Sequence, residues 1–88
     1  MSEAVLKAVA LRYPDWADAP YISALAEGRT AQYLLEVAEA HDIPVVQNSD
    51  MVNVLSIQSV GDFIPEETYA VIAGIFAFIA KVEKKANE

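Results

Sequence analysis

A short apolar stretch at residues 43–47 constrains the fold of this chain most, because a helical pattern precedes it and another follows it. Pro44 cannot continue the preceding helix, since proline lacks a backbone N–H and its ring clashes with the turn before it. Asn48, Ser49 and Asp50 then offer side-chain oxygens to the free N–H groups of a new helix start. The stretch is therefore predicted to be a strand that joins two helices.

Both flanking segments have the spacing of helices with one apolar face. Residues 30–41 place Leu34 and its apolar neighbours on one side and glutamates on the other. Residues 50–57 repeat this arrangement, with Leu55 on the buried side. Thr30 is predicted to cap the first of these helices, because its side-chain oxygen suits that position.

Two further strands are predicted upstream. Residues 4–13 carry apolar side chains on both alternating faces, which is typical of a strand covered on both sides. Residues 21–26 follow a loop bounded by prolines and end at a glycine turn. Because strand, helix and strand succeed one another, a right-handed parallel crossover is predicted from residues 21–26 to 43–47. The prediction is an α/β fold, with a small mixed β-sheet of about three to four strands flanked by three helices in one domain, residues 1–88.

The last predicted helix, residues 65–84, is apolar on more than one side. Pro65 suits its first turn, where no N–H is needed. One apolar stripe contains Tyr69, Ile72, Ala73, Phe76 and Ala80, and a second contains Val71, Ile75, Phe78 and Val82. Two interpretations remain open: the helix is wedged between the sheet and neighbouring segments, or the second stripe binds a protein partner or a second copy of the chain.

Trp16 lies in the proline-bounded loop between two aspartates, Asp15 and Asp18. Tryptophan is enriched among the side chains that contribute most to protein interfaces, so Trp16 is a candidate partner-binding residue. The alternative is that Trp16 covers the core. The loop has no periodicity that would decide between these positions.

Charge and composition exclude several classes of function. Thirteen acidic and six basic residues give a formal charge of −7, which repels nucleic acid and anionic lipid. The chain has no cysteine, so it has neither disulfides nor thiolate metal sites. Its N-terminus has no basic targeting region, and the apolar run at residues 69–80 is shorter than the roughly 20 residues that cross a bilayer. A cytoplasmic protein without membrane insertion is expected.

No catalytic, cofactor-binding or metal-binding residue is predicted. His41 is the only histidine, and Ser49 and Asp50 near it are better explained as helix caps than as parts of a catalytic triad. The carboxylates do not have the spacing of a metal-binding loop. Gly28 and Gly61 are interpreted as turn residues with positive φ rather than as a phosphate-binding loop.

An ordered set of short motifs resembles the cytoplasmic domain of the type III export switch proteins, the FlhB family of flagella and its injectisome relatives. The motifs are Ala8-Val9-Ala10-Leu11-Arg12-Tyr13, Ala19-Pro20, Gly28, Gly61, Ile64-Pro65-Glu66 and Tyr69. The resemblance covers roughly residues 6–80. Its specificity lies in the order of the motifs, since none of them is diagnostic alone.

The resemblance fails at one functional motif. Members of that family carry Asn-Pro-Thr-His before the first of these strands and cleave their own chain between the Asn and the Pro. Glu3, Ala4, Val5 and Leu6 occupy those places here, so this is a degenerate autocleavage motif. The family also has a transmembrane region before this domain. A stand-alone, uncleaved form of the domain is therefore expected.

The resemblance also implies partners. In the family this domain recognises export substrates, their chaperones and other gate components, and it takes part in switching export from rod and hook proteins to filament proteins. We expect a non-catalytic interaction module, docked at the export apparatus on the inner face of the cell membrane. The alternatives are a self-processing switch domain and a relative that kept the fold and lost the export role.

Overall fold

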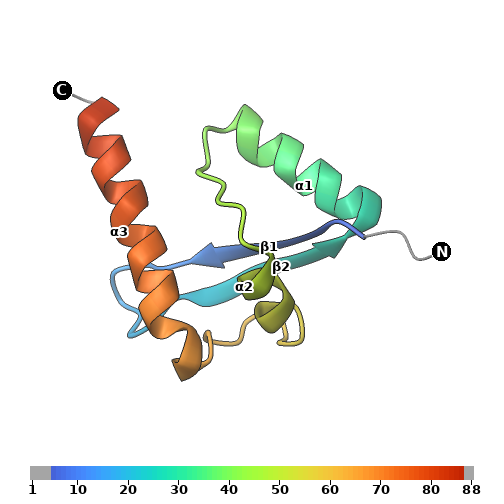
Figure 1. Ribbon diagram of the computed structural model, residues 1–88, viewed down its shortest axis with the longest axis horizontal. Coiled ribbons are helices and arrows are strands. Elements are labelled where there is room, and N and C mark those ends of the chain that lie inside the picture. The colour runs from blue at the N-terminus through green and yellow to red at the C-terminus, as the bar shows by residue number, and fades with distance from the viewer. Residues whose placement is uncertain (1–4, 87–88) are drawn as a thin grey trace.

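Strands β1 (Lys7–Arg12) and β2 (Tyr21–Glu27) pair antiparallel and form the sheet of the molecule (Figure 1). The computed structural model describes residues 5–86, with side chains described as far as Val82. Three helices and one 3-10 turn complete it: α1 (Gly28–Ala40), α2 (Ser49–Leu55), η1 (Glu66–Thr68) and α3 (Tyr69–Ala86). Helices α1 and α2 lie on opposite sides of the strand pair, and α3 crosses the end where β1 finishes and β2 begins (Figure 1).

The register of the strand pair separates a large-residue face from an alanine face. Leu11 lies opposite Ile22 on the first face, whereas Ala10 lies opposite Ala24 on the second. The register shifts between Ala10 and Leu11, and the Ser23 hydroxyl donates a hydrogen bond of 3.2 Å to the Ala10 carbonyl at this irregularity. A bulge of this kind increases the local twist and re-aims the following side chains.

The core lies on the large-residue face. Three side chains, each only 3% exposed, form its buried centre: Leu55 of α2, Ile64 of the segment before η1, and Ile72 of α3. Partly buried side chains pack against this centre from three elements: Val9, Leu11, Met51, Ile75 and Phe76. This cluster therefore joins β1, α2 and α3, whereas α1 packs against the sheet outside the cluster, with Ala31 fully buried.

Three helices and a small sheet in a single α/β domain confirm the predicted fold class, although the strand count is lower than predicted. The strand predicted at residues 43–47 is absent, and so is the parallel crossover that depended on it. Ile43, Val45 and Val46 are 54%, 57% and 40% exposed. Because one antiparallel pair is the whole sheet among residues 5–86, β1 is an edge strand, and its two faces are covered by α1 and α2.

The end of α1 explains why residues 43–47 leave the sheet. The Ile43 N–H donates to the Ala38 carbonyl at 2.8 Å, and the Asp42 N–H donates to the Glu39 carbonyl at 3.2 Å. Asp42 is left-handed, with φ of 56°. These are the bonds and the backbone of a Schellman ending, which uses the first residue of the stretch to close the helix. Pro44 then offers no N–H for a sheet.

The helix starts test the predicted caps. Thr30 is not a cap, because α1 begins earlier, at Gly28, with Glu27 in the cap position and no side-chain cap bond. Gly28 and Gly61 have positive φ angles of 61° and 96°, as predicted for turn residues. At α2 the Asn48 side chain accepts a hydrogen bond of 3.1 Å from the Met51 N–H, which confirms capping there.

The last helix begins one turn after Pro65, which has an extended backbone and precedes η1. The Thr68 hydroxyl donates to the Pro65 carbonyl at 2.7 Å, and Thr68 is fully buried. This bond satisfies a buried hydroxyl and fixes the direction in which α3 leaves the turn. The consequence is that Tyr69, Ile72 and Phe76 follow one another along the side of α3 that faces the sheet.

Candidate protein-binding site

The loop between β1 and β2 is held against the segment that precedes α3. The Ile64 N–H donates to the Pro20 carbonyl at 3.0 Å, and the Ile22 N–H donates to the Asp62 carbonyl at 2.9 Å. Ala19 and Pro20 are buried at this junction. The backbone bonds thus extend the strand pair locally and fix the loop beneath the start of α3.

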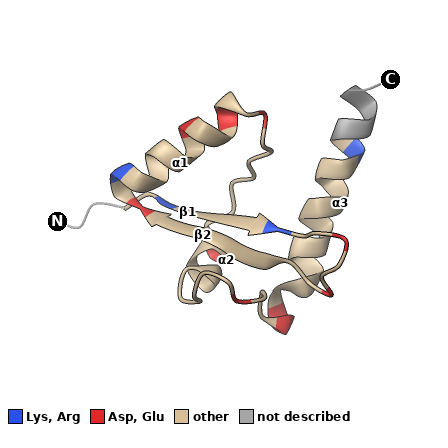
Figure 2. Cartoon of the chain, turned by 180° about the vertical axis from the view of Figure 1, so that it is seen from behind, with Lys and Arg blue, Asp and Glu red and all other residues tan. Residues whose placement is uncertain are grey.

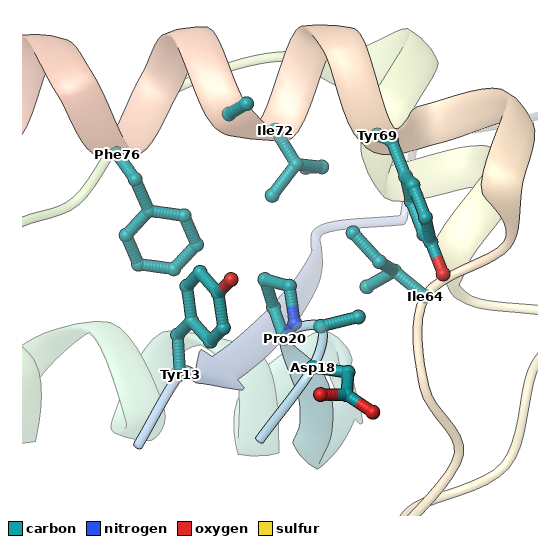
Figure 3. A pocket seen from close by; sticks show the side chains of 9 residues that line it. Tyr13, Asp18, Pro20, Ile64, Tyr69, Ile72 and Phe76 are labelled. Carbon is teal, nitrogen blue, oxygen red and sulfur yellow. The ribbon is translucent and has the colours of Figure 1, made fainter. Parts of the chain in front are cut away.

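An apolar pocket of about 250 Å³ opens between this loop and α3 (Figure 3). On the helix side, Ile72 and Phe76 point toward Pro20 and Tyr13, and Tyr69 lies beside Ile64 (Figure 3). The complete lining is Tyr13, Asp18, Ala19, Pro20, Ile64, Tyr69, Ile72, Ala73 and Phe76. Asp18 is the only charged residue among them.

Aromatic contacts shape one wall of the pocket. The rings of Tyr13 and Phe76 meet edge to face, with centroids 5.9 Å apart and an interplanar angle of 60°. This arrangement is favourable beyond its area, because the positive edge of one ring meets the negative face of the other. Ala73 adds only a methyl group between Ile72 and Phe76, which leaves the hollow that a larger side chain would fill.

The size of the pocket indicates what it can hold. Small-molecule and cofactor sites usually occupy about 300–1,000 Å³, which is more than this pocket offers. A dry cavity of about 150 Å³ already holds benzene. The pocket is therefore large enough for one apolar side chain, and the Asp18 carboxylate lies at its edge.

The family comparison decides what kind of domain this is. The FlhB HrpN YscU SpaS family matches residues 6–79, which is most of the chain. The chain belongs to this family. The match spans both strands, all three helices as far as the middle of α3, and every residue that lines the pocket.

Individual members of the family are similar over most of this chain. Over 84 residues it is 33% identical to the uncharacterized protein YlqH of Bacillus subtilis, covering 94% of this chain and 90% of YlqH. It is 34% identical to the flagellar biosynthetic protein FlhB of the same organism and 35% identical to that of Aquifex aeolicus, over 89% of this chain. The matches cover only 22% and 23% of those two FlhB proteins.

A solved structure shows the same fold. The crystal structure of the PscU C-terminal domain superposes with a TM-score of 0.78, covering 83% of this chain and 95% of that one. Its sequence is 21% identical, so the likeness concerns the fold alone. The fold described above is therefore that of the PscU C-terminal domain.

Three of the four residues predicted for the second stripe of α3 share an exposed side of the helix. Val71, Phe78 and Val82 are 43%, 62% and 49% exposed. Ile75 is not part of that surface, because it is half-buried and packs against the core. The helix is thus neither wedged on all sides nor bare along the whole predicted stripe. Partner binding by these residues stays a prediction.

Trp16 is an exposed residue rather than a cover of the core. Its side chain is 75% exposed and stacks on Tyr21, with ring centroids 6.2 Å apart. This position agrees with the exposed alternative considered for Trp16. Its role in binding a partner stays a prediction.

The residues in place of the autocleavage motif lie just before β1. Glu3 and Ala4 lie outside the described residues. Val5 and Leu6 are 57% and 46% exposed, and the Leu6 carbonyl accepts a hydrogen bond of 2.8 Å from the Gly28 N–H. The last of the four positions is therefore anchored to the start of α1.

The sequence pattern does not indicate the pocket, because it places most of the lining residues in a strand, a loop and the first apolar stripe of the last helix. The available signals were small residues at two places, Ala73 on the inward stripe and Ala19-Pro20 in the loop. Small residues at facing positions leave room between elements. Which positions face one another, however, depends on the tertiary fold.

Among residues 5–86 there is no group of three or more side chains placed to hold a metal ion. In the same range no helix combines the length and the apolar character needed to cross a membrane. His41 is exposed at the end of α1.

Proposed function

We propose that this domain is a non-catalytic protein-interaction module of the flagellar, type III, export apparatus. In this role it substitutes for, or modulates, the cytoplasmic domain of the export switch protein. The observation that carries the proposal is the apolar pocket between the β1–β2 loop and α3, which has the size of a side-chain site. Membership of the FlhB family supports the export context.

The pocket is suited to recognition rather than to chemistry. Its lining is apolar except for one carboxylate and two phenols, and it contains none of the serine, cysteine, histidine or lysine side chains that most often act as nucleophile or general base. Full burial of a Val, Leu, Ile, Phe or Met side chain of a partner against apolar walls contributes roughly 1.5–3 kcal/mol to the free energy of binding. Binding of this kind is weak and reversible, which suits a module that meets a series of export partners.

The partners proposed are export substrates, their chaperones or other gate components on the inner face of the cell membrane. A suitable test uses a Bacillus subtilis strain whose FlhB lacks the segment that aligns with this chain. If the proposal holds, expression of this domain restores or alters secretion of hook and filament proteins, measured in the culture medium. Unchanged secretion in the presence of folded, abundant domain would contradict it.

Self-processing is the alternative that the sequence disfavours. The three asparagines Asn48, Asn53 and Asn87 precede Ser, Val and Glu, so the chain contains no Asn-Pro bond. The purified protein should keep the mass of the full 88-residue chain, allowing for removal of Met1, after long incubation at raised pH. Release of a discrete N-terminal fragment would overturn the non-catalytic assignment.

A further inference from the structure

Three aromatic side chains lie on the face of the sheet turned away from the pocket: Trp16, Tyr21 and Phe63. We call them the aromatic row. The Trp16 ring stacks on the Tyr21 ring at an interplanar angle of 28°. Tyr21 pairs with Phe63 through an isolated antiparallel bridge, and residues opposite each other in such a bridge point to the same side. Ile22, next along the strand, is fully buried, so Tyr21 points away from the core.

The aromatic row is exposed without being needed by the core. Trp16 is 75% exposed and Phe63 is 54% exposed. Tryptophan is on average highly buried in folded proteins, and contiguous exposed apolar surface marks interaction sites. The two rings therefore present open π-faces to a partner.

Carboxylates surround the aromatic row. Asp15 precedes Trp16 and Asp62 precedes Phe63 in the chain, and both are exposed. The β1–β2 loop and the turn before α3 are marked by acidic residues at this end of the molecule (Figure 2). Arg12, opposite Tyr21 in the register, is the one basic residue placed at this row by the strand pairing.

We propose that the aromatic row is a second binding surface, which takes an arginine or lysine side chain from a basic peptide segment of a protein partner. Cations are attracted to the faces of Trp, Tyr and Phe, and the arginine guanidinium also stacks on them. Asp15 supplies complementary charge, and Asp62, whose carboxylate also accepts a hydrogen bond of 3.0 Å from the Ser59 N–H, adds to it. Since Arg12 already lies opposite Tyr21, the incoming cation belongs over the exposed ring of Trp16 or of Phe63.

Charge separates this partner from the other ligands that aromatic surfaces bind. Single-stranded nucleic acid stacks on aromatic side chains only where a positive groove follows its backbone. Interfacial aromatics that approach anionic lipid are assisted by basic residues. The acidic border of the aromatic row opposes both. The inference does not rest on the proposed export function, because it uses a different face and a different chemistry.

The test is a titration of the full-length protein with a blocked peptide of alternating glycine and arginine, followed by NMR. Saturable shifts are expected at the indole N–H of Trp16 and at Tyr21 and Phe63, with an affinity in the millimolar range. A peptide with citrulline in place of arginine keeps the shape and loses the charge, and it should not bind. Shifts confined to the pocket residues Tyr69 and Phe76, or to acidic residues of α1, would overturn the proposal.

Variants sharpen the same experiment. Trp16→Leu and Phe63→Leu keep an apolar side chain and remove a π-face, so each should weaken arginine-peptide binding about two- to fivefold. Tyr33→Leu, at a 66% exposed aromatic position on α1, is the matched control and should leave binding unchanged. Circular dichroism checks that all three fold. Equal binding by Trp16→Leu and the unaltered protein, no binding of the arginine peptide, or preferential binding of an oligothymidine would each contradict the proposal.

Discussion

The two apolar sides of α3 have similar composition, yet only one of them is covered. Ile72 is 3% exposed and Ile75 packs against the core, whereas Phe78 and Val82 are 62% and 49% exposed. At 3.6 residues per turn, Val71, Phe78 and Val82 fall on the side of the helix opposite the pocket. The difference shows that the apolar content of one helix is divided between holding the fold and presenting surface.

The pocket lies along the edge of the covered side that is away from the stripe of Val71, Phe78 and Val82. Ala73 is exposed and lines the pocket beside the buried Ile72. The far half of α3 stands away from the sheet (Figure 1). The radius of gyration, 13.6 Å, accordingly exceeds the value of about 12 Å expected for a compact chain of this length. The covered side can therefore serve stability while its edge remains open to a partner.

The largest expected effect separates the two sides directly. Ile72→Ser removes a buried side chain and places a hydroxyl in the core, so the free energy of unfolding should fall by about 3–5 kcal/mol. That is most of the stability of a small domain, which starts at about 5 kcal/mol. Phe78→Ser should change it by less than about 0.5 kcal/mol. Urea unfolding followed by circular dichroism measures both, and comparable losses would show that the two sides are equally covered.

Ile75→Ser tests the border and should have an intermediate effect. Ile75 is half-buried against the core, so its truncation should cost about 1–2 kcal/mol. For a domain of this size 1 kcal/mol lowers Tm by about 4–8 °C, which a thermal melt resolves. A Tm equal to that of Phe78→Ser would indicate that Ile75 belongs to the exposed stripe with Val71, Phe78 and Val82.

The next prediction concerns the other exposed apolar region, residues 43–47. Asp42 adopts a left-handed backbone, which costs a residue with a side chain more than it costs glycine. Asp42→Gly should therefore raise the free energy of unfolding by about 0.5–1 kcal/mol. Urea unfolding checks the sign. A loss of stability would indicate that the chain does not leave α1 through this left-handed turn.

The smallest expected effect is at Val45, whose side chain is 57% exposed. Val45→Ser should change the free energy of unfolding by less than about 0.5 kcal/mol, as for other exposed positions. A residue of a buried strand would lose several times more. A loss of more than about 2 kcal/mol in the free energy of unfolding would indicate that residues 43–47 form the buried strand that the sequence pattern predicts.

Local chemistry made much of this fold predictable. The apolar spacing located all three helices, and Asn48 and Gly28 marked a cap and a turn through properties of single residues. Strand β2 matches its predicted position with one residue more, and β1 is shorter than the predicted residues 4–13. These elements depend on contacts close in sequence or on strong alternation.

The remaining elements depend on tertiary partners that a sequence pattern does not specify. Residues 43–47 have the composition of a strand. The left-handed turn at Asp42, which follows the end of α1, directs them away from β1. The pocket needs Tyr13, Pro20 and Phe76 to meet, and these residues come from a strand end, a loop and a distant helix. The aromatic row likewise forms only because Tyr21 and Phe63 pair across a bridge.

The central claim, that the pocket at the edge of α3 binds a protein partner, is tested most directly by filling it. Ala73→Arg inserts a long side chain into the pocket from an exposed position, so the domain should still fold. Ala70→Arg adds the same charge to the same helix from an exposed position that does not line the pocket. In the Bacillus subtilis secretion assay, the account predicts that Ala73→Arg abolishes the effect of the domain and that Ala70→Arg retains it. Full activity of a folded Ala73→Arg variant would contradict the account.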